Sequence, residues 1–470
     1  MATPQRFNVV VIGAGPAGTL AAARAAELGA RTALVTRGAF GGMAANEGPI
    51  PVRTLAHAAR LLREAEQLPR YGIAVAQPSL DYRRLVQRAM EVVAETRSHS
   101  TLLDRVEAAG VALFENAGSA AFEDSTTIRC ERGPTLRADR IVICSGGVSR
   151  KLSCPGAELA ATPADAFGLS SLPRSLLVIG AGATGMQVAS IFNALGSCVT
   201  LCQAGPRIVP SEDADVSIEM ARAFREDGIE VFENAGHIAS FESVPSGIRT
   251  RWNDGGPKPR ESTLVVAAIG WQADTTRLNL SAAGIETDSR GFIKVDDFYR
   301  TTASHVYAAG DVIGRSMLVP QAVKEGFIAA TNAVSSNTLS RLRDIEPIGS
   351  FTDPEYAKVG LTEEEARRSH DVSVSRADYS DITRPIIDGR TRGLCKLVID
   401  RANGTILGCH IVGERAVEVA QMAAIAMTAS MKVEDLARIP LSFPTYANVL
   451  GRAALRATQL SEGIATGEPM

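Results

Sequence analysis

Residues 7–18 read FNVVVIGAGPAG, and this stretch decides the fold of the first part of the chain. The mostly apolar residues 7–12 are short enough for a buried parallel strand. They lead into Gly13, Gly15 and Gly18, and the alanine-rich sequence up to residue 27 predicts a helix. The first glycine permits a tight turn, the second lets backbone N–H groups touch a pyrophosphate, and the third lets helix and strand pack closely. The stretch therefore predicts a dinucleotide-binding unit.

The same plan occurs a second time, since Gly180 stands 167 positions after Gly13. Here an apolar strand (SLLVI, residues 175–179) precedes GAGATG, a helix through residue 195 and a strand over 198–202. A single glycine pattern of this kind is weak evidence, because glycine-rich turns are common. Two copies in full strand–turn–helix context predict two dinucleotide sites.

The position that usually carries a ribose-binding acid, about 20 residues after the first glycine, is neutral in both copies. Counting 23 residues from each first glycine reaches Thr36 and Gln203. A hydroxyl or an amide still hydrogen-bonds a ribose, and without a carboxylate nothing repels a 2′-phosphate. Arg207 also lies close to Gln203 in sequence. The sequence therefore leaves both NADH and NADPH open as the second ligand.

The last third of the chain changes pattern and predicts an α+β domain. Residues 394–400 and 405–412 alternate around Asn403-Gly404, which indicates a hairpin with a type I′ turn. Residues 417–431 then form an apolar segment rich in Ala and Met. We expect this segment to be a helix buried on most sides, in part by a partner subunit.

Composition excludes several classes of protein. At 470 residues with 45% hydrophobic and 21% charged residues, the chain predicts about three globular domains. A net charge of -3 argues against a nucleic-acid partner. The seven cysteines are scattered without a Cys-x-x-Cys pair, which favours a reducing cytosol over disulfides or a metal site. With no signal-peptide pattern and no apolar run of about 18 residues, we expect a soluble, cytoplasmic protein without a membrane span.

Four motifs in order carry a family resemblance. GAGPAG and the second glycine turn are followed by VYAAGDV (residues 306–312) and FTDPEYAKVGLTEEEA (residues 351–366). With these motifs the chain resembles the FAD-dependent pyridine nucleotide-disulfide oxidoreductases, such as lipoamide dehydrogenase, glutathione reductase and mercuric reductase. The resemblance implies an α/β fold with two Rossmann-like domains and a homodimer. The implied segments are an FAD-binding domain (1–150), an NAD(P)-binding domain (151–275), a return to the FAD-binding domain (276–346) and a C-terminal α+β dimerisation domain (347–470).

The resemblance also implies two sets of cofactor contacts, with Asp311 holding the ribityl chain or the phosphates of FAD. The FAD set is Gly13, Gly15, Pro16, Ala17, Gly18, Thr36, Arg37, Gly42, Met43, Arg53, Gly118, Ser145, Gly146, Asp311 and Ala322. The NADH or NADPH set is Gly180, Gly182, Ala183, Thr184, Gly185, Gln203, Arg207 and Gly270.

The redox centre departs from the family. The family motif GG-T-C-x-N-x-G-C-x-P-x-K supplies two cysteines, and residues 41–53 here keep its glycines, asparagine and proline but carry Ala44 and Pro49 at the cysteine positions. Electrons that leave reduced flavin through a disulfide need sulfur at that point. The C-terminal His–Glu pair of the family is likewise replaced, by Phe443 and Asn448. Both losses argue against disulfide and mercuric reduction.

Two further departures concern the expected catalytic residues. The family's Lys–Glu pair at the flavin becomes Arg53 and Gln187, and Ala183 replaces the tyrosine that often covers the nicotinamide pocket. Arginine keeps its proton and would place a permanent cation near the reactive edge of the flavin. His57, one helical turn beyond Arg53, is better explained as an ordinary helix residue.

These residues predict an NAD(P)H-dependent flavoprotein oxidoreductase that passes electrons directly to a small organic acceptor such as a quinone. The expected acceptor pocket is formed by Ala44, Pro49 and, from the other subunit, Phe443 and Tyr446. Apolar and aromatic walls suit a flat molecule. A soluble pyridine nucleotide transhydrogenase is an alternative, and a flavin-bound sensor or assembly partner with little turnover is another.

Overall fold

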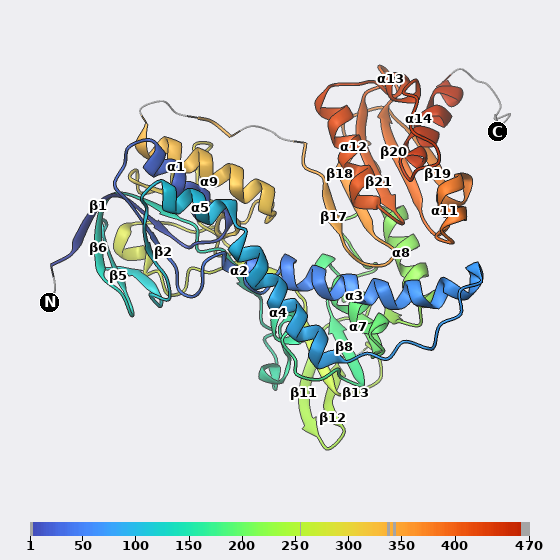
Figure 1. The fold of residues 1–470 in the computed structure, drawn as a ribbon, viewed down its shortest axis with the longest axis horizontal. Coiled ribbons are helices and arrows are strands. Elements are labelled where there is room, and N and C mark those ends of the chain that lie inside the picture. Colours follow the sequence, from blue (N-terminus) through green and yellow to red (C-terminus); the bar gives the residue numbers. More distant parts are fainter. Residues whose placement is uncertain (1–2, 254, 336–338, 342–344, 462–470) are drawn as a thin grey trace. The chain divides into compact units, whose positions relative to one another are not determined.

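The structure is a computed structural model that describes residues 3–253, 255–335, 339–341 and 345–461. The chain forms two compact units (Figure 1). The first contains residues 1–55, 83–150 and 270–343, and the second contains residues 56–82, 151–269 and 344–470. Within the described residues, no helix combines the length and the apolar character that crossing a membrane requires.

The first unit is built on a seven-stranded sheet, in the order β3-β2-β1-β6-β5-β4 with β16 also paired to β6. The strands β1, β2, β3, β6 and β16 run parallel, and β4 and β5 form an antiparallel extension. Their carboxyl ends therefore meet at one edge of the sheet. The bounds are β1 Gln5–Ile12, β2 Thr32–Val35, β3 Ala112–Phe114, β4 Ala120–Phe122, β5 Thr127–Cys130, β6 Thr135–Ile143 and β16 Val306–Ala308.

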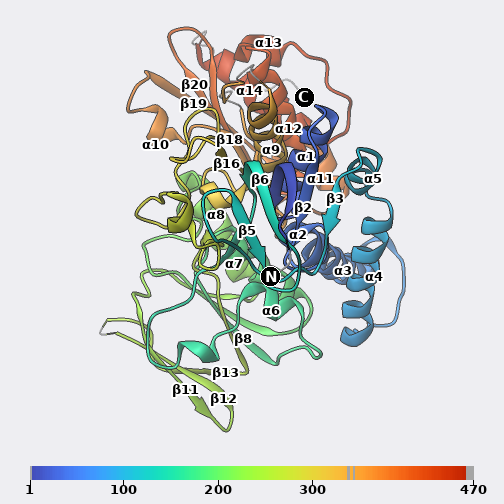
Figure 2. The ribbon, with the colours of Figure 1, turned by 90° about the vertical axis from the view of Figure 1, so that its left-hand side faces the viewer.

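Helices α1 (Pro16–Glu27) and α9 (Val319–Val334) pack against each other on this sheet (Figures 1 and 2). Their contact is close because Gly326 of α9 faces the backbone of Ala17 in α1. The unit also contains α2 (Gly42–Asn46), α4 (Tyr82–Ser98), α5 (Thr101–Ala108) and the paired strands β7 (Gly147–Ser149) and β15 (Trp271–Ala273). Helix α3 (Pro49–Gln67) begins in this unit and ends in the other.

The second unit contains a parallel sheet in the order β10-β9-β8-β14, next to an antiparallel sheet of β11, β12 and β13. Strands β8, β9 and β14 are almost wholly buried, as expected for strands covered on both faces, whereas the edge strand β10 is partly exposed. The bounds are β8 Ser175–Ile179, β9 Cys198–Cys202, β10 Glu230–Phe232, β14 Leu264–Ala267, β11 Ile238–Val244, β12 Gly247–Trp252, β13 Arg260–Ser262, α6 Pro163–Phe167, α7 Ala183–Ala194 and α8 Ala214–Glu226.

The same unit ends in a five-stranded antiparallel sheet, in the order β17-β18-β21-β20-β19. Helices α12 and α14 supply the alanine-rich residues that pack on it. The bounds are β17 Ile348–Ser350, β18 Tyr356–Gly360, β19 Val372–Asp378, β20 Leu394–Asp400, β21 Ile406–Val412, α10 Glu363–Ala366, α11 Thr383–Ile387, α12 Ala416–Thr428, α13 Val433–Ala437 and α14 Asn448–Ser461.

The predicted hairpin of this sheet is present, but its predicted turn type is wrong. A type I′ turn needs positive φ at both central residues, and only Gly404 (φ +70°) has it, whereas Asn403 does not. The loop is longer than two residues because the Gly404 N–H and the Asn403 N–H both bond to the carbonyl of Asp400. Glu434 of α13 lies against Gly404, so tertiary packing fixes this loop.

The close contact of α1 and α9 generates a prediction about stability. A Cβ at residue 326 would overlap the carbonyl group of Ala17, so Gly326→Ala must push the two helices apart. Overpacking of this kind costs about 1–3 kcal/mol. We expect a lower melting temperature and less bound FAD per chain, measured by thermal unfolding and by flavin absorbance. Gly38→Ala is the control, since its Cβ would meet nothing within 4 Å. Equal behaviour of the two variants would contradict the prediction.

Candidate functional site

The first glycine turn has the geometry of a pyrophosphate cradle. Gly13 has φ +105°, and a Cβ there would overlap the backbone of Cys144 at the end of β6. A Cβ at Gly18 would overlap the carbonyl of Gly13, so the helix can approach the turn only through glycine. At Gly15 a Cβ would meet nothing within 4 Å. A side chain is therefore excluded at Gly13 and Gly18, whereas the surface beside Gly15 is open to a ligand.

Helix α1 presents its N-terminus to this open space. Its N-cap is Gly15, in an extended conformation, and no side chain caps the helix. Pro16 occupies the first helical position, where its missing N–H costs nothing. The remaining N–H groups and the positive end of the helix dipole attract a phosphate. Ala17 is buried against α9 and fixes the position of the helix.

Residues that follow the neighbouring strands meet at the same edge. Thr36, directly after β2, is only 6% exposed, and its N–H bonds to the carbonyl of Phe114 in β3. Arg37 donates from Nη1 to Asp274 Oδ2 at 2.9 Å and so forms an ion pair with it. Asp274 is a residue that the sequence analysis did not identify. Gly118 has φ +70° and donates its N–H to the carbonyl of Arg37.

Two polar groups at this edge fit a bound hydroxyl-rich cofactor. The Ser145 Oγ atom after β6 is buried and has no hydrogen-bond partner among the described residues. Asp311, after β16, makes no side-chain hydrogen bond within the described part of the chain, and burial raises the pKa of its carboxyl group. A carboxylate and a hydroxyl that lack protein partners match the hydroxyl groups of FAD. The FAD-binding assignment of these two residues therefore agrees with the local chemistry.

A buried acid that sequence reasoning missed supports Asp311. Glu325 of α9 is 6% exposed and its Oε2 atom accepts a hydrogen bond from the N–H of Gly310 at 2.8 Å. Gly310 has φ +80° and lies directly before Asp311. A glutamate in a largely apolar helix was the only signal in the sequence. Ala322, one turn earlier on α9, is buried.

The segment with the altered redox motif keeps its local structure. Gly42 and Met43 begin α2, and Gly42 lies against the backbone of Gly15. Ala44 lies on the same helix, and Pro49 is the first residue of α3, a favourable place for proline. Arg53 and His57 are exposed on α3.

The second glycine turn repeats the geometry of the first. Gly180 has φ +96°, and a Cβ there would overlap the carbonyl of Ala268 after β14. Gly185 packs on Gly180, while Gly182 faces open space and caps α7 without a side-chain hydrogen bond. The cradle of the second unit therefore fits a second dinucleotide. Ala183 and Thr184 begin α7, and Ala183 is exposed.

Gln203 is built into this turn. Its Oε1 atom accepts a hydrogen bond from the N–H of Ala181 at 3.0 Å, which leaves its amide N–H groups as the donors directed elsewhere. The carbonyl of Ala181 accepts from the N–H of Val209 at 2.8 Å. Arg207, in the loop between them, donates to the carbonyl of Pro210 at 3.1 Å. The side chain at the ribose position is thus a neutral hydrogen-bond donor.

Three predicted site residues fall on different units. Arg53 lies in the first unit and Gln187 in the second, where its Nε2 atom donates to the carbonyl of Ala183 at 3.3 Å. Their expected pairing at the flavin stays a prediction. Gly270 begins the returning segment of the first unit, while the other NAD(P) residues lie in the second.

The C-terminal aromatic residues differ in exposure. Phe443 is 75% exposed, so its ring is available to a partner. Tyr446 is half-buried and donates its hydroxyl to Asp388 Oδ2 at 2.7 Å. Asn448 accepts the N–H of Thr445 at 2.9 Å and so stabilises the start of α14.

All seven cysteines are free thiols. Cys202 is buried on β9, whereas Cys198 is exposed at the start of that strand. The fold also brings Cys395 and Cys409 together, with 3.9 Å between the two Sγ atoms, although they are 14 residues apart. Both are wholly buried in the C-terminal domain, where they pack as small core residues.

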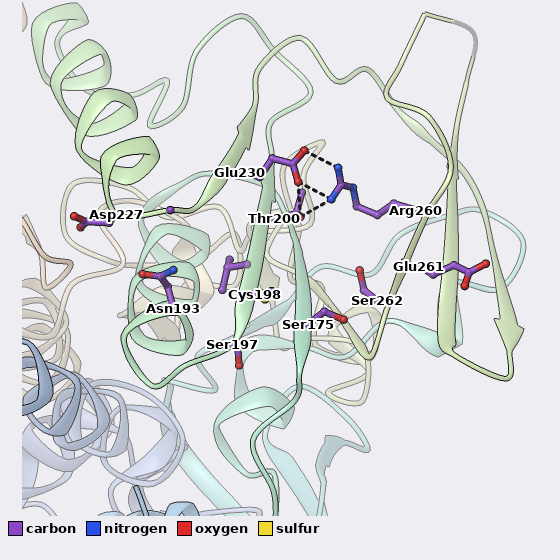
Figure 3. Close-up of a pocket in the computed structure, with 12 residues that line it drawn as sticks. Ser175, Asn193, Ser197, Cys198, Thr200, Asp227, Glu230, Arg260, Glu261 and Ser262 are labelled. Carbon is purple, nitrogen blue, oxygen red and sulfur yellow. Dashed lines mark hydrogen bonds and ion pairs between the residues drawn. The ribbon is translucent and has the colours of Figure 1, made fainter. Parts of the chain in front are cut away.

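A surface hollow of about 320 Å³ lies at the other end of the parallel sheet (Figure 3). Ser175, Cys198 and Glu230, the first residues of β8, β9 and β10, line it, whereas dinucleotides bind at the carboxyl ends of such strands. Arg260 is bonded to Glu230 and Thr200 (Figure 3). The hollow is therefore separate from the nucleotide cradle.

Known proteins share this architecture along nearly the whole chain. The profile of the pyridine nucleotide-disulphide oxidoreductase family matches residues 7–326, and the profile of its dimerisation domain matches residues 347–454. The dihydrolipoyl dehydrogenase of Zymomonas mobilis is 31% identical over 458 residues, covering 96% of this chain and 98% of that protein. The mercuric reductase of Lysinibacillus sphaericus is 32% identical over 456 residues, covering 96% and 82%.

Among solved structures, the HOCl-induced flavoprotein disulfide reductase RclA from Escherichia coli superposes with a TM-score of 0.85. It is 25% identical and covers 96% of this chain and 99% of its own. These matches confirm the predicted family and the α/β fold class, and the dimerisation domain supports a homodimer. FAD and NAD(P)H are the cofactors of such proteins, and both cradles fit them. The chain belongs to the pyridine nucleotide-disulphide oxidoreductase family of flavoproteins.

Proposed function

We propose that this flavoprotein is an NAD(P)H:acceptor oxidoreductase that passes electrons from reduced FAD directly to a small organic acceptor of the quinone type. The observation that carries the proposal is the redox segment, residues 41–53, which contains no cysteine. Ala44 and Pro49 stand where the family motif has its two thiols. Without sulfur at this point, a cysteine relay between flavin and acceptor has no site.

The other thiols of the FAD-binding unit are poor replacements. Burial raises the pKa of Cys130 to about 11 and also raises the pKa of Cys144. With raised pKa values, both thiols stay protonated near neutral pH. Since the thiolate is the reactive form, both groups are then poor redox relays. Cys144 also lies behind the Gly13 turn, where its backbone packs against the glycine. The proposal therefore needs no hidden dithiol.

The C-terminal residues support the same conclusion. A disulfide reductase needs an acid–base group to protonate the leaving thiolate. Phe443 has no titratable atom, and the amide of Asn448 is bonded to the backbone of Thr445. An exposed aromatic ring suits contact with a flat organic molecule better than proton transfer to sulfur.

The residues of this chain would bind the two cofactors, orient them and stabilise negative charge on the reduced flavin. FAD, when bound, supplies hydride acceptance from NAD(P)H and electron transfer to the acceptor. The N-termini of α1 and α7 would hold the two pyrophosphates, and Asp311 would accept hydrogen bonds from hydroxyl groups. Arg53, which retains its proton, would stabilise negative charge on the reduced ring.

The relatives named above are a dihydrolipoyl dehydrogenase, a mercuric reductase and a flavoprotein disulfide reductase, so the proposal departs from them in the acceptor and in the absence of a cysteine relay. Pyridine nucleotide transhydrogenation is the second candidate, and Gln203 favours it. A neutral amide at the ribose position accepts NADH and NADPH without charge repulsion. A flavin-bound sensor with little turnover is the outcome if no acceptor reoxidises the flavin.

The proposal is tested by anaerobic titration of the purified yellow protein with NADH and, separately, NADPH. About one equivalent should bleach the flavin, because one flavin takes up one hydride. No thiolate-to-flavin charge-transfer band should appear. Addition of a quinone should then restore the oxidised spectrum, whereas restoration by the oxidised form of the other nucleotide would indicate transhydrogenation. A requirement for two equivalents, or the band itself, would show a dithiol and overturn the proposal.

A second prediction concerns Arg53. Replacement by methionine keeps an unbranched side chain as long as the aliphatic part of arginine but removes the charge, so Arg53→Met should retain FAD and lower the reduction potential of the flavin. A change of roughly 20–40 mV corresponds to the loss of one nearby charge of about 1–2 kcal/mol. The measurement is a dye-coupled redox titration. Arg83→Met, an exposed position on α4, is the matched control. An unchanged potential would remove Arg53 from the catalytic residues.

A third prediction concerns the choice of nucleotide. Gln203→Glu keeps the oxygen that accepts the Ala181 N–H but adds a negative charge beside the ribose. The ratio of KM for NADPH to KM for NADH should rise about tenfold, which is a repulsion of about 1.4 kcal/mol. Steady-state kinetics with both nucleotides measure the ratio. Gln5→Glu at the exposed start of β1 is the control with the same charge change. An unaltered ratio would place Gln203 away from the 2′ position.

A further inference from the structure

Three basic side chains form a row across the C-terminal sheet. Lys358 of β18 pairs in register with His410 of β21, and His410 pairs with Lys396 of β20. Directly opposite residues point to the same face of a sheet, so the three side chains face the same way. Burial lowers the pKa of His410, which keeps this ring neutral between the two cations. Helix α8 packs against β21 of this sheet, and the two lysines of the row reach residues directly before and at the start of α8.

The row meets acidic residues at the start of α8. Lys396, with a side chain only 3% exposed, lies 2.8 Å from Asp213, 2.8 Å from Asp215 and 2.7 Å from Glu363. Asp213 is itself 2% exposed and accepts a further bond from the N–H of Glu363 at 3.0 Å. Burial alone would raise the pKa of Asp213, but the Lys396 ammonium and this N–H lower it. Lys396 and Asp213 are thus a buried ion pair, and the same ammonium group also binds the partly exposed carboxylates of Asp215 and Glu363.

Lys358 binds the residues directly before this cluster. Its Nζ atom donates to the carbonyl of Ser211 at 2.6 Å and lies 3.1 Å from Glu212 Oε1. Glu212 is 6% exposed. Two lysines of the C-terminal domain therefore hold three consecutive residues, 211–213, of the nucleotide-binding domain.

These three residues end the loop that touches the nucleotide cradle. The loop, residues 203–213, begins at Gln203, which binds the N–H of Ala181, and continues to Val209, which binds the carbonyl of Ala181. Both backbone groups of Ala181, inside the GAGATG turn, are therefore held by the loop. Through these two bonds, the position of the loop influences the position of the second glycine turn.

One loop residue is held in an unfavourable conformation. Val209 has φ +39° and is 1% exposed. A β-branched residue at positive φ persists only where its surroundings hold it. Its carbonyl is bound by Ser217 Oγ of α8 at 3.3 Å, and residue 211, held by Lys358, lies two positions further along. The Glu212 N–H also donates to this carbonyl at 2.9 Å, and Glu212 contacts Lys358, so the anchored end of the loop contributes to holding Val209.

We propose that Lys396 and Lys358 of the C-terminal domain are positioning residues for NAD(P)H, because they anchor the loop that fixes the second glycine turn. Neither lysine touches the nucleotide in this scheme. Both act through residues 211–213, Val209 and Ala181. The inference concerns the nucleotide donor and is independent of the acceptor.

The test uses the FAD-loaded enzyme with Lys396→Met, which leaves the buried Asp213 carboxylate without its cation and removes the bonds to Asp215 and Glu363. The Kd for NAD⁺ and NADP⁺ is measured by isothermal titration calorimetry, and anaerobic stopped-flow gives the limiting rate of flavin reduction. We expect Kd to rise about tenfold, since small displacements of a binding group have effects of this size or larger. The limiting rate at saturating nucleotide should change by less than about twofold. Lys396→Arg should restore the affinity.

Lys358→Met is the milder second variant, and it decides the question alone if Lys396→Met fails to fold. It should raise Kd roughly threefold, because it releases residues 211 and 212 while the Lys396 cluster stays paired. Lys432→Met is the matched control, since Lys432 lies in the same domain and binds Thr405 at 2.6 Å. A lower melting temperature with unchanged Kd in both variants would overturn the proposal, because the cluster would then only hold two domains together.

Discussion

Direct contact between backbones, made possible by glycine, is the constraint on which both nucleotide cradles depend. Gly18 lies against Gly13 in the first turn, and Gly185 lies against Gly180 in the second. Only this contact brings the N-terminus of each helix to the end of its strand, where free N–H groups can meet a pyrophosphate. The parallel register then adds the other ligand-facing residues, since β2, β6 and β16 end at the same edge as β1. Gly326 extends the constraint to α9, the helix that carries Glu325.

Features specified by a few neighbouring residues could be predicted from sequence, and features that depend on distant partners could not. Both glycine turns and their flanking strands and helices were predictable, since their residues lie within about 30 positions. The bond between Arg37 and Asp274 joins positions 237 residues apart, and no local pattern marks it. The contact of Cys395 with Cys409 depends on strand register. The turn at Asn403-Gly404 was predicted wrongly because α13 packs on it and a longer loop results.

The contact between the C-terminal and nucleotide-binding domains includes the buried ion pair of Lys396 and Asp213, although apolar packing would also hold two domains together. Lys396 and Asp213 are 183 residues apart, so the sequence alone does not connect them. Buried ion pairs add little net stability relative to well-packed apolar groups, but they tolerate few alternative arrangements. An apolar contact would let residues 211–213 slide, whereas the bonds of Lys358 to residues 211 and 212 and of Lys396 to Asp213 fix their place. For the strained loop at Val209, contacts that fix its position matter more than contacts that add net stability.

The redox segment keeps the hydrogen bonds that shape it although it contains no cysteine. The Asn46 side chain bonds to the carbonyls of Phe40 and Gly42, at 3.1 and 2.8 Å, and these bonds hold α2 without any contribution from sulfur. Pro49 is a good first residue for α3, so the helix start is kept as well. Asn448 likewise retains a hydrogen-bond acceptor for the turn before α14. The residues that fold each segment are thus different from those that would carry thiol chemistry. On the proposed function, replacement of the thiols would change the acceptor, while the residues that shape the two nucleotide cradles are kept.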